Sequence, residues 1–165
     1  MDKEAYKHLM SDPYFKLRPE PPTPVEGLCD CQRMAEIYLA HKLRSNPVYC
    51  LSCNGQIPPD KLGCGEQLAE DIASWNSLYG ALYHLWLDSG EYETWARERL
   101  LDPEGQVNLR GMELVGLLDS IAKTYYLWFY ESDESAPTTC PLCGAALTAR
   151  EGCRFAMCEN CRVIV

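Results

Sequence analysis

The sequence predicts a mainly α-helical protein, in which an antiparallel core of about three helices lies between an N-terminal cysteine zinc site and a C-terminal four-cysteine zinc ribbon. Three observations predict this class. Apolar residues in the middle of the chain recur at helical spacing, the ten cysteines gather on either side of that stretch, and three cysteine pairs have the Cys-x-x-Cys spacing. The 165 residues, 47% of them hydrophobic and 24% charged, suit one core with a small appended module.

The chain divides into four expected segments. They are an N-terminal helix, proline spacer and first zinc knuckle region (1–63), the helical core (64–130), an acidic hinge (131–139) and the zinc ribbon (140–165). Within the first segment, the helix is expected over 2–11. The spacer at 19–24, Pro-Glu-Pro-Pro-Thr-Pro, excludes helix and central strand because proline removes a backbone donor and fixes φ.

The helical core rests on hydrophobic periodicity. The first stripe advances in steps of four and three residues, as the buried side of a helix that ends at Asp88 should: Leu68, Ile72, Trp75, Tyr79, Leu82 and Trp86. A second helix is expected over 91–101 and a third over 109–130. Their short connections predict antiparallel neighbours. A further helix is expected over 32–44.

The third predicted helix is unusually aromatic at its end, where Tyr125, Tyr126, Trp128, Phe129 and Tyr130 follow one another closely. Neighbouring helical residues point about 100° apart, so one side of a helix cannot bury all five. Either N-terminal segments enclose this helix, or some of its aromatic rings are exposed.

The C-terminal cysteines have the spacing of a zinc ribbon. Two Cys-x-x-Cys knuckles, separated by fourteen residues, predict one tetrahedral site made of Cys140, Cys143, Cys158 and Cys161. Gly144 suits the tight turn after the first knuckle, and short strands are expected over 148–150, 154–157 and 163–165. Four thiolates leave no coordination position for water, so this zinc is expected to be structural. Cys153, between the knuckles, is expected to be a buried thiol.

The N-terminal cysteines allow more than one ligand set. The preferred set is Cys29, Cys31, Cys50 and Cys53, although Cys-x-Cys is a tighter pair than Cys-x-x-Cys. Cys64, between two glycines, is the rival for one of the first two positions. His41 is a further candidate ligand, but a histidine on an amphipathic surface is the more common case.

Zinc explains the cysteines better than disulfides do. A disulfide within Cys-x-x-Cys closes only a tiny loop and joins nothing distant. The segment Met1-Asp2-Lys3-Glu4 lacks the features of a secretory signal, and no apolar run reaches the length of about 18 residues that a membrane helix needs. We therefore expect a cytoplasmic protein, with no membrane partner, that holds two Zn²⁺ ions per chain.

The net charge of −9 is distributed unevenly. Residues 64–104 contain nine acidic and two basic side chains, and 105–139 contain five and two, whereas 1–63 are neutral and 140–165 carry +1. Each zinc site with four thiolates adds a further −2, which would bring the chain to about −13. Nucleic acid is therefore an unfavoured partner that only Arg150, Arg154 and Arg162 of the ribbon would contact.

The expected partner is instead a basic protein, bound by the acidic, aromatic helices. We predict a non-enzymatic, zinc-binding interaction module, with an inhibitor or toxin-immunity role as one form of it. A nucleic-acid-binding regulator is the alternative. The chain contains no His-Glu-x-x-His sequence, phosphate-binding loop or nucleophile elbow, so no catalytic residue is assigned.

Several helix residues resemble a bacterial group of uncharacterised proteins with two Cys-x-x-Cys motifs, which are described as zinc-ribbon-containing and possibly nucleic-acid-binding. The resemblance extends over about residues 48–161 and includes Cys50/Cys53 and Cys140/Cys143. Its helix signature consists of Ser89-Gly90-Glu91-Tyr92-Glu93, Trp95-Ala96, Leu101-Asp102-Pro103, Val107-Asn108, Gly111 and Tyr125-Tyr126-Leu127. It implies a bacterial cytoplasmic protein whose metal sites flank helices.

Overall fold

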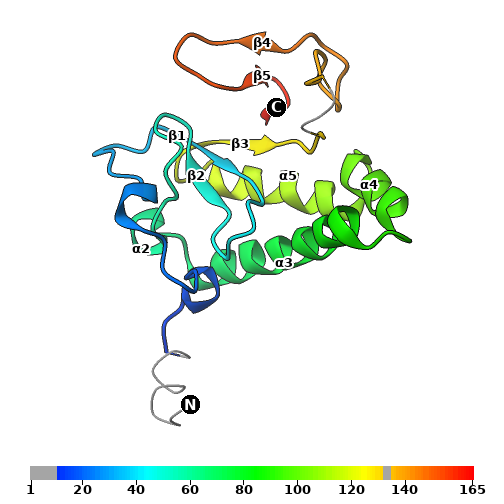
Figure 1. Cartoon of the computed structure of the whole chain (residues 1–165). Coiled ribbons are helices and arrows are strands. Elements are labelled where there is room, and N and C mark those ends of the chain that lie inside the picture. Colours follow the sequence, from blue (N-terminus) through cyan, green and yellow to red (C-terminus); the bar gives the residue numbers. More distant parts are fainter. Residues whose placement is uncertain (1–10, 132–134) are drawn as a thin grey trace.

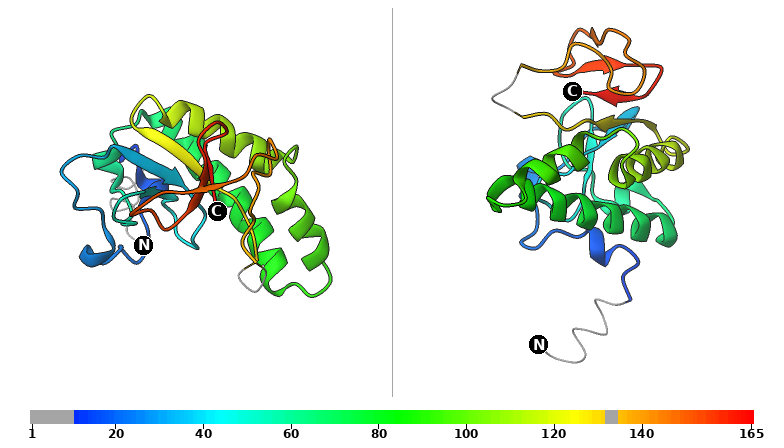
Figure 2. Two further views of the ribbon diagram at one scale, coloured as in Figure 1. Left: turned by 90° about the horizontal axis from the view of Figure 1, so that it is seen from above. Right: turned by 90° about the vertical axis from the view of Figure 1, so that its right-hand side faces the viewer.

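The computed structural model describes residues 11–131 and 135–165. The helix predicted over 2–11 therefore lies almost entirely outside the described residues. Three layers are visible in the described part: helices on one side, strands in the middle and the C-terminal hairpin on the other side (Figures 1 and 2).

The central layer is a six-stranded mixed sheet, so the prediction of a mainly α protein with an antiparallel helical core is wrong. The strand order is β2-β1-β3-β6-β5-β4. The strands span Glu36–Leu39 (β1), Val48–Cys50 (β2), Lys123–Leu127 (β3), Thr148–Ala149 (β4), Ala156–Cys158 (β5) and Val163–Ile164 (β6). β3 pairs in parallel with both β1 and β6, and the outer pairs are antiparallel.

The three predicted core helices exist in part, but they cover one face of this sheet. They are α3 (Glu66–Asp88), α4 (Glu93–Leu101) and α5 (Gln106–Leu118), and a short helix, α2 (Pro59–Leu62), precedes them. Two 3₁₀ turns, η1 (Phe15–Leu17) and η2 (Val25–Gly27), lie in the N-terminal segment. None of the described helices has the length and hydropathy that crossing a membrane would need.

Residues 32–44, predicted as a helix, contain strand β1. Ile37 and Leu39 belong to the hydrophobic core on the helix side of the sheet, whereas Tyr38 and Ala40 belong to a second core on the opposite side. A strand that is buried on both faces has a continuous apolar run instead of an alternating one. Such a run resembles a stretch of buried helix, and this explains the wrong prediction.

The helix predicted over 109–130 ends at Leu118 and is followed by β3. The strand resolves the problem of the adjacent aromatic residues, because successive side chains of a strand point to opposite faces. Tyr126 is buried against the helices and Tyr125 in the second core, both with no exposed surface. Of the five aromatic residues in this run, only Tyr130 is substantially exposed, at 37%.

The C-terminal hairpin covers the second face of the sheet. Met157 and Ile164 pack there with Tyr38, Tyr49 and Tyr125. The ring of Phe155 lies edge-on to that of Tyr38, with 5.2 Å between the centroids. Because β6 also forms backbone hydrogen bonds with β3, the hairpin is part of the sheet as well as its cover (Figure 2).

Candidate metal centres

The eight predicted ligands form two separate clusters. Cys29, Cys31, Cys50 and Cys53 make the N-terminal cluster, and Cys140, Cys143, Cys158 and Cys161 make the C-terminal cluster. Within each cluster, all Sγ atoms lie within 4.8 Å of one another. All ten cysteines of the chain are free thiols in this structure.

The sulfur separations fit zinc. Four thiolates placed about 2.3 Å from a Zn²⁺ ion at the corners of a tetrahedron are about 3.8 Å apart. The Cys31 and Cys50 sulfurs are 3.9 Å apart, and those of Cys143 and Cys158 are 3.7 Å apart. A disulfide would require about 2.05 Å. Two clusters of four cysteines at metal-binding distance thus provide for two zinc ions per chain, as the cysteine spacing predicted.

Every Cys-x-x-Cys knuckle is followed by a residue in the left-handed region. These residues are Asn54 (φ 58°), Gly144 (φ 71°) and Arg162 (φ 58°). The positive φ turns the chain back, so that the backbone N–H of Asn54 donates to the carbonyl of Cys50 and that of Gly144 to the carbonyl of Cys140. The prediction for Gly144 is confirmed. At Arg162, a side chain occupies a conformation that glycine adopts without strain.

Gly55 is needed because the backbone of the Cys-x-Cys segment passes close to it. An added Cβ would lie 2.7 Å from the backbone nitrogen of Cys29 and 2.8 Å from the carbonyl carbon of Leu28. The backbone N–H groups of Cys29 and Gln56 donate to the carbonyl oxygens of Gln56 and Gly27, respectively. Gly55 therefore allows the Cys-x-Cys segment to approach the knuckle closely enough for four sulfurs to meet.

Lys61 supports the N-terminal cluster, and no cysteine pattern indicated it. Its ammonium group donates to the carbonyl oxygens of Cys29 and Cys31, at 3.0 and 2.6 Å, and lies 3.8 Å from the Cys29 sulfur. It fixes the Cys-x-Cys turn and brings a positive charge to a group of ligands that is negative when ionised. In the sequence, Lys61 is a single lysine between two prolines and Gly63, and this pattern is too common to indicate a role beside a metal site.

Without a cation, the thiols of each cluster do not ionise equally. The backbone N–H of Ala145 lowers the pKa of Cys143 to about 7. Hydrogen bonds to Cys53 and Cys50 raise the pKa of Cys31 to about 12, and burial raises the pKa of Cys161 to about 12. Zinc binding therefore requires the displacement of protons.

The two rival ligands, Cys64 and His41, lie outside the clusters, and so does Cys153. Cys64 is buried in the helix-side core, and Cys153 is half-buried against the second core. The Nδ1–H of His41 donates one hydrogen bond to the side-chain oxygen of Asn76, at 2.8 Å. Its ring stacks on Tyr79, and Gly80 leaves room for it against α3. It thus joins the β1–β2 connection to a helix.

Two of the three ribbon arginines are engaged with carboxylates. Arg150 forms a two-point ion pair with Glu36, at 2.9 and 2.7 Å, which holds the end of β4 to the start of β1. Arg162 lies 3.7 Å from Asp119. Among the described residues, Arg154 has no carboxylate within ion-pair distance, and its guanidinium lies 5.5 Å from the centroid of the Phe155 ring.

One apolar surface stands out on the helical side. A hollow of about 370 Å³ is lined by Leu85, Tyr92 and Trp95, where α3 ends and α4 begins. Tyr92 and Trp95 are each 51% exposed. Together with three exposed carboxylates that are close in sequence, these residues form what we call the corner patch: Leu85, Asp88, Glu91, Tyr92, Glu93 and Trp95.

Comparison of the chain with protein-family models, with curated proteins and with solved structures finds no match. The two cysteine clusters are consistent with the zinc-binding part of the resemblance described above. Its bacterial and nucleic-acid-binding parts receive no support from these comparisons.

Proposed function

We propose that this protein is a non-enzymatic, zinc-stabilised interaction module, whose corner patch binds a basic protein. The observation that carries the proposal is the pair of half-exposed rings, Tyr92 and Trp95, beside an apolar hollow and among carboxylates. Tyrosine and tryptophan are the residues that most often supply binding energy at interfaces.

The charge of the surroundings favours a basic partner. Asp88, Glu91 and Glu93 are exposed around the two rings, and the stretch 64–104 has a net charge of −7. Complementary charge steers association and selects between partners more than it adds affinity. A basic enzyme that the patch blocks, such as a nuclease toxin, would fit an inhibitor or immunity role.

The metal clusters have a structural part in this proposal. Each offers four thiolates, which saturate a tetrahedral zinc ion. The N-terminal cluster fixes the start of β1 and the end of β2, and the C-terminal cluster fixes the hairpin that covers the second core. Because zinc-binding cysteines must remain reduced, the two clusters suit a reducing compartment, and we propose that the protein is cytoplasmic. The proposal of a bacterial source rests on the resemblance alone.

The test is affinity capture with the tagged, zinc-loaded chain and its Tyr92→Ala/Trp95→Ala variant. At low salt, the wild type should retain a protein of high isoelectric point. The double variant should lose at least about 90% of it, because each interface anchor contributes about 1–2 kcal/mol or more. Added salt should release the partner.

Leu117→Ala is the matched control, because Leu117 is 52% exposed on α5 and lies outside the corner patch. It should retain the partner as the wild type does. Retention of the same protein by wild type and double variant alike, or recovery of no basic protein at low salt, would count against the proposal.

A nucleic-acid-binding regulator is the second candidate, and Arg154 is the observation that favours it, since this cation has no acidic partner among the described residues. The other two ribbon arginines, Arg150 and Arg162, are engaged with carboxylates, so only one of the three is free to contact a phosphate backbone. A gel shift at low salt that is lost in Arg154→Ala would establish this function, and the absence of any shift would remove it.

A further inference from the structure

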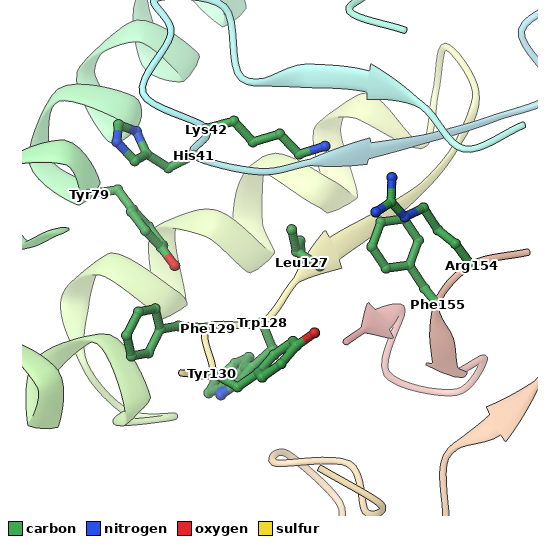
Figure 3. A pocket seen from close by; sticks show the side chains of 9 residues that line it. All are labelled: His41, Lys42, Tyr79, Leu127, Trp128, Phe129, Tyr130, Arg154 and Phe155. Atoms are coloured by element: carbon green, nitrogen blue, oxygen red, sulfur yellow. The ribbon is translucent and has the colours of Figure 1, made fainter. Parts of the chain in front are cut away.

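A second cavity lies where β1 and β3 end, between these strand ends, the hairpin and α3. Its volume is about 240 Å³. The nine side chains that line it come from all three of these segments and from α3 (Figure 3). None of them belongs to a cysteine cluster or to the corner patch.

Two cations face this cavity without an acidic partner in the described part of the chain. The Lys42 amine donates to the hydroxyl of Tyr38, at 2.6 Å, and lies 4.2 Å from the centroid of the Tyr49 ring. Among the described residues, neither Lys42 nor Arg154 has a carboxylate within 4 Å. In Figure 3 the two side chains reach toward one another across one end of the cavity.

Two cations without a carboxylate partner line this one cavity, in a chain that has 24 acidic and only 15 basic side chains. Most other cations of the described part have a carboxylate partner: Lys16, Arg18, Arg97, Arg99, Lys123, Arg150 and Arg162. Burial, and then the charge of Arg154, lower the pKa of Lys42 to about 8. An anion between the two groups would favour the charged form of the buried Lys42 amine and would reduce its repulsion from Arg154.

The remaining walls are mostly aromatic, and they also contain the imidazole of His41 and the hydroxyls of Tyr79 and Tyr130. Trp128 and Tyr130 lie along the side opposite Lys42, and Leu127 forms the floor (Figure 3). Tyr79 is only 5% exposed, yet its hydroxyl has no hydrogen-bond partner in the described part of the chain and points into the cavity. This hydroxyl is therefore free to form a hydrogen bond with a ligand or a water molecule in the cavity.

From these contacts we infer that the cavity binds a small organic anion. A flat ring would lie along Trp128 and Tyr130, and a carboxylate or phosphate group would lie between Lys42 and Arg154. The volume is sufficient, since a cavity of about 150 Å³ holds a benzene ring in another protein. The site is separate from the corner patch, so it does not depend on the proposed function.

The test is calorimetric titration of the full zinc-loaded chain with two ring-bearing anions, indole-3-acetate and adenosine 5′-monophosphate. They distinguish a carboxylate from a phosphate ligand. Indole and adenosine are the uncharged controls, and acetate and inorganic phosphate are the controls without a ring. At least one ring-bearing anion should bind with a Kd below about 1 mM, at least tenfold tighter than both of its own controls.

Variants test the assignment to this cavity. Arg154→Gln and Lys42→Met should each weaken binding about tenfold, through loss of a charge-assisted contact. Arg110→Gln, which makes the same charge change on α5 away from the cavity, should leave binding unchanged. Tyr79→Phe should weaken binding several-fold with no loss of stability, and Tyr83→Phe, one turn further along α3, should not.

Three results would overturn the inference. The first is that neither ring-bearing anion binds below 1 mM. The second is that binding is equal in wild type and Arg154→Gln. The third is that a single-stranded octanucleotide binds at least tenfold tighter than adenosine 5′-monophosphate and is weakened by the same variants, since the site would then belong to a nucleic-acid surface.

Discussion

At the scale of single residues, the helix-side core depends on a polar group that apolar patterns do not reveal. Asn108, at the start of α5, is 1% exposed. Its amide donates to the carbonyl oxygens of Leu100 and Asp102, at 2.9 and 2.8 Å, and its oxygen accepts from the hydroxyl of Tyr126, at 2.8 Å. One side chain thus connects the end of α4, the start of α5 and strand β3.

Removal of the Tyr126 hydroxyl should therefore be costly. Tyr126→Phe leaves the Asn108 oxygen buried without a donor, so we expect the free energy of unfolding to fall by about 1–3 kcal/mol. Urea denaturation of the zinc-loaded protein measures it. Tyr79→Phe, which removes a hydroxyl that has no partner in the described part of the chain, should change stability by less than about 0.5 kcal/mol. Equal effects of the two variants would refute the role of the hydrogen bond.

Two glycines of α5 should respond in opposite directions to alanine. At Gly111, an added Cβ would lie 2.8 Å from Cζ of Tyr126 and 3.1 Å from Nε1 of Trp75, so Gly111→Ala should cost about 1–3 kcal/mol of unfolding free energy. At Gly116, nothing in the described part of the chain lies within 4 Å. Gly116→Ala should therefore stabilise the protein by up to about 1 kcal/mol, through helix propensity. Thermal unfolding compares the two, and stabilisation by Gly111→Ala would contradict the close packing.

At the scale of elements, the hairpin is attached to the sheet by charge as well as by strand pairing. The carboxylate of Glu36, at the start of β1, accepts two hydrogen bonds from Arg150 of the hairpin. It also lies 3.4 Å from the amine of Lys123, at the start of β3. Tyr125 donates to Glu159 of the second hairpin knuckle, at 2.9 Å. These contacts connect β1, β3 and both ends of the hairpin.

Glu36→Gln should loosen this attachment in a pH-dependent way. Hydrogen bonding to Arg150 lowers the pKa of Glu36 below its ordinary value of 4.5. The stabilising contribution is therefore fully present above about pH 4.5 and is lost as the pH falls through the lowered folded-state pKa. Between pH 8 and pH 5, Glu36→Gln should lower stability by a constant amount of about 1 kcal/mol.

Thermal unfolding of both proteins across that range checks this prediction. Glu26→Gln, a change of an exposed carboxylate in η2, is the control and should have no effect. A difference between wild type and Glu36→Gln that already shrinks between pH 7 and pH 5 would show that the pKa of Glu36 is not lowered.

Some of the helices and strands could be predicted from the sequence, and others could not. The helix ending at Asp88, the helix ending at Leu101 and three short hairpin strands follow from periodicity and cysteine spacing. Strands β1 and β3 could not be predicted in this way. Their segments Ile37-Tyr38-Leu39 and Tyr125-Tyr126-Leu127 pack on both faces, so they lack the alternation of apolar and polar residues that distinguishes a strand. What covers their second face is the hairpin, more than a hundred residues from β1 along the chain.

The metal clusters were easier to predict than the sheet that they hold, because Cys-x-x-Cys spacing is set locally by the knuckle turn. The tight Cys29-Asp30-Cys31 pair joins its knuckle as the preferred ligand set required. The cavity between β1, β3 and the hairpin could not be predicted, since its lining depends on the placement of two strands that the apolar pattern assigns to helices.

At the scale of the whole molecule, the two clusters should be separable in zinc content. Cys158→Ser removes one ligand of the C-terminal site, so the chain should retain about one zinc ion instead of two. Cys153→Ser, five residues away and outside both clusters, should retain two. Release of zinc to a chromogenic chelator in denaturant gives the count. A single ion in Cys153→Ser, or two tightly held ions in Cys158→Ser, would overturn the ligand assignment.

The position of β6 between β3 and β5 has a consequence for biosynthesis. β3 leaves the ribosome well before β6, so one side of it stays without its partner strand until residues 163–164 have been made. The N-terminal cysteines, in contrast, are complete once Cys53 has emerged. Maturation should therefore proceed in order along the chain. An early zinc ion would organise the first hairpin on the nascent polypeptide, and a later one would fix the cover of the tyrosine-rich face only after Cys161 has been made.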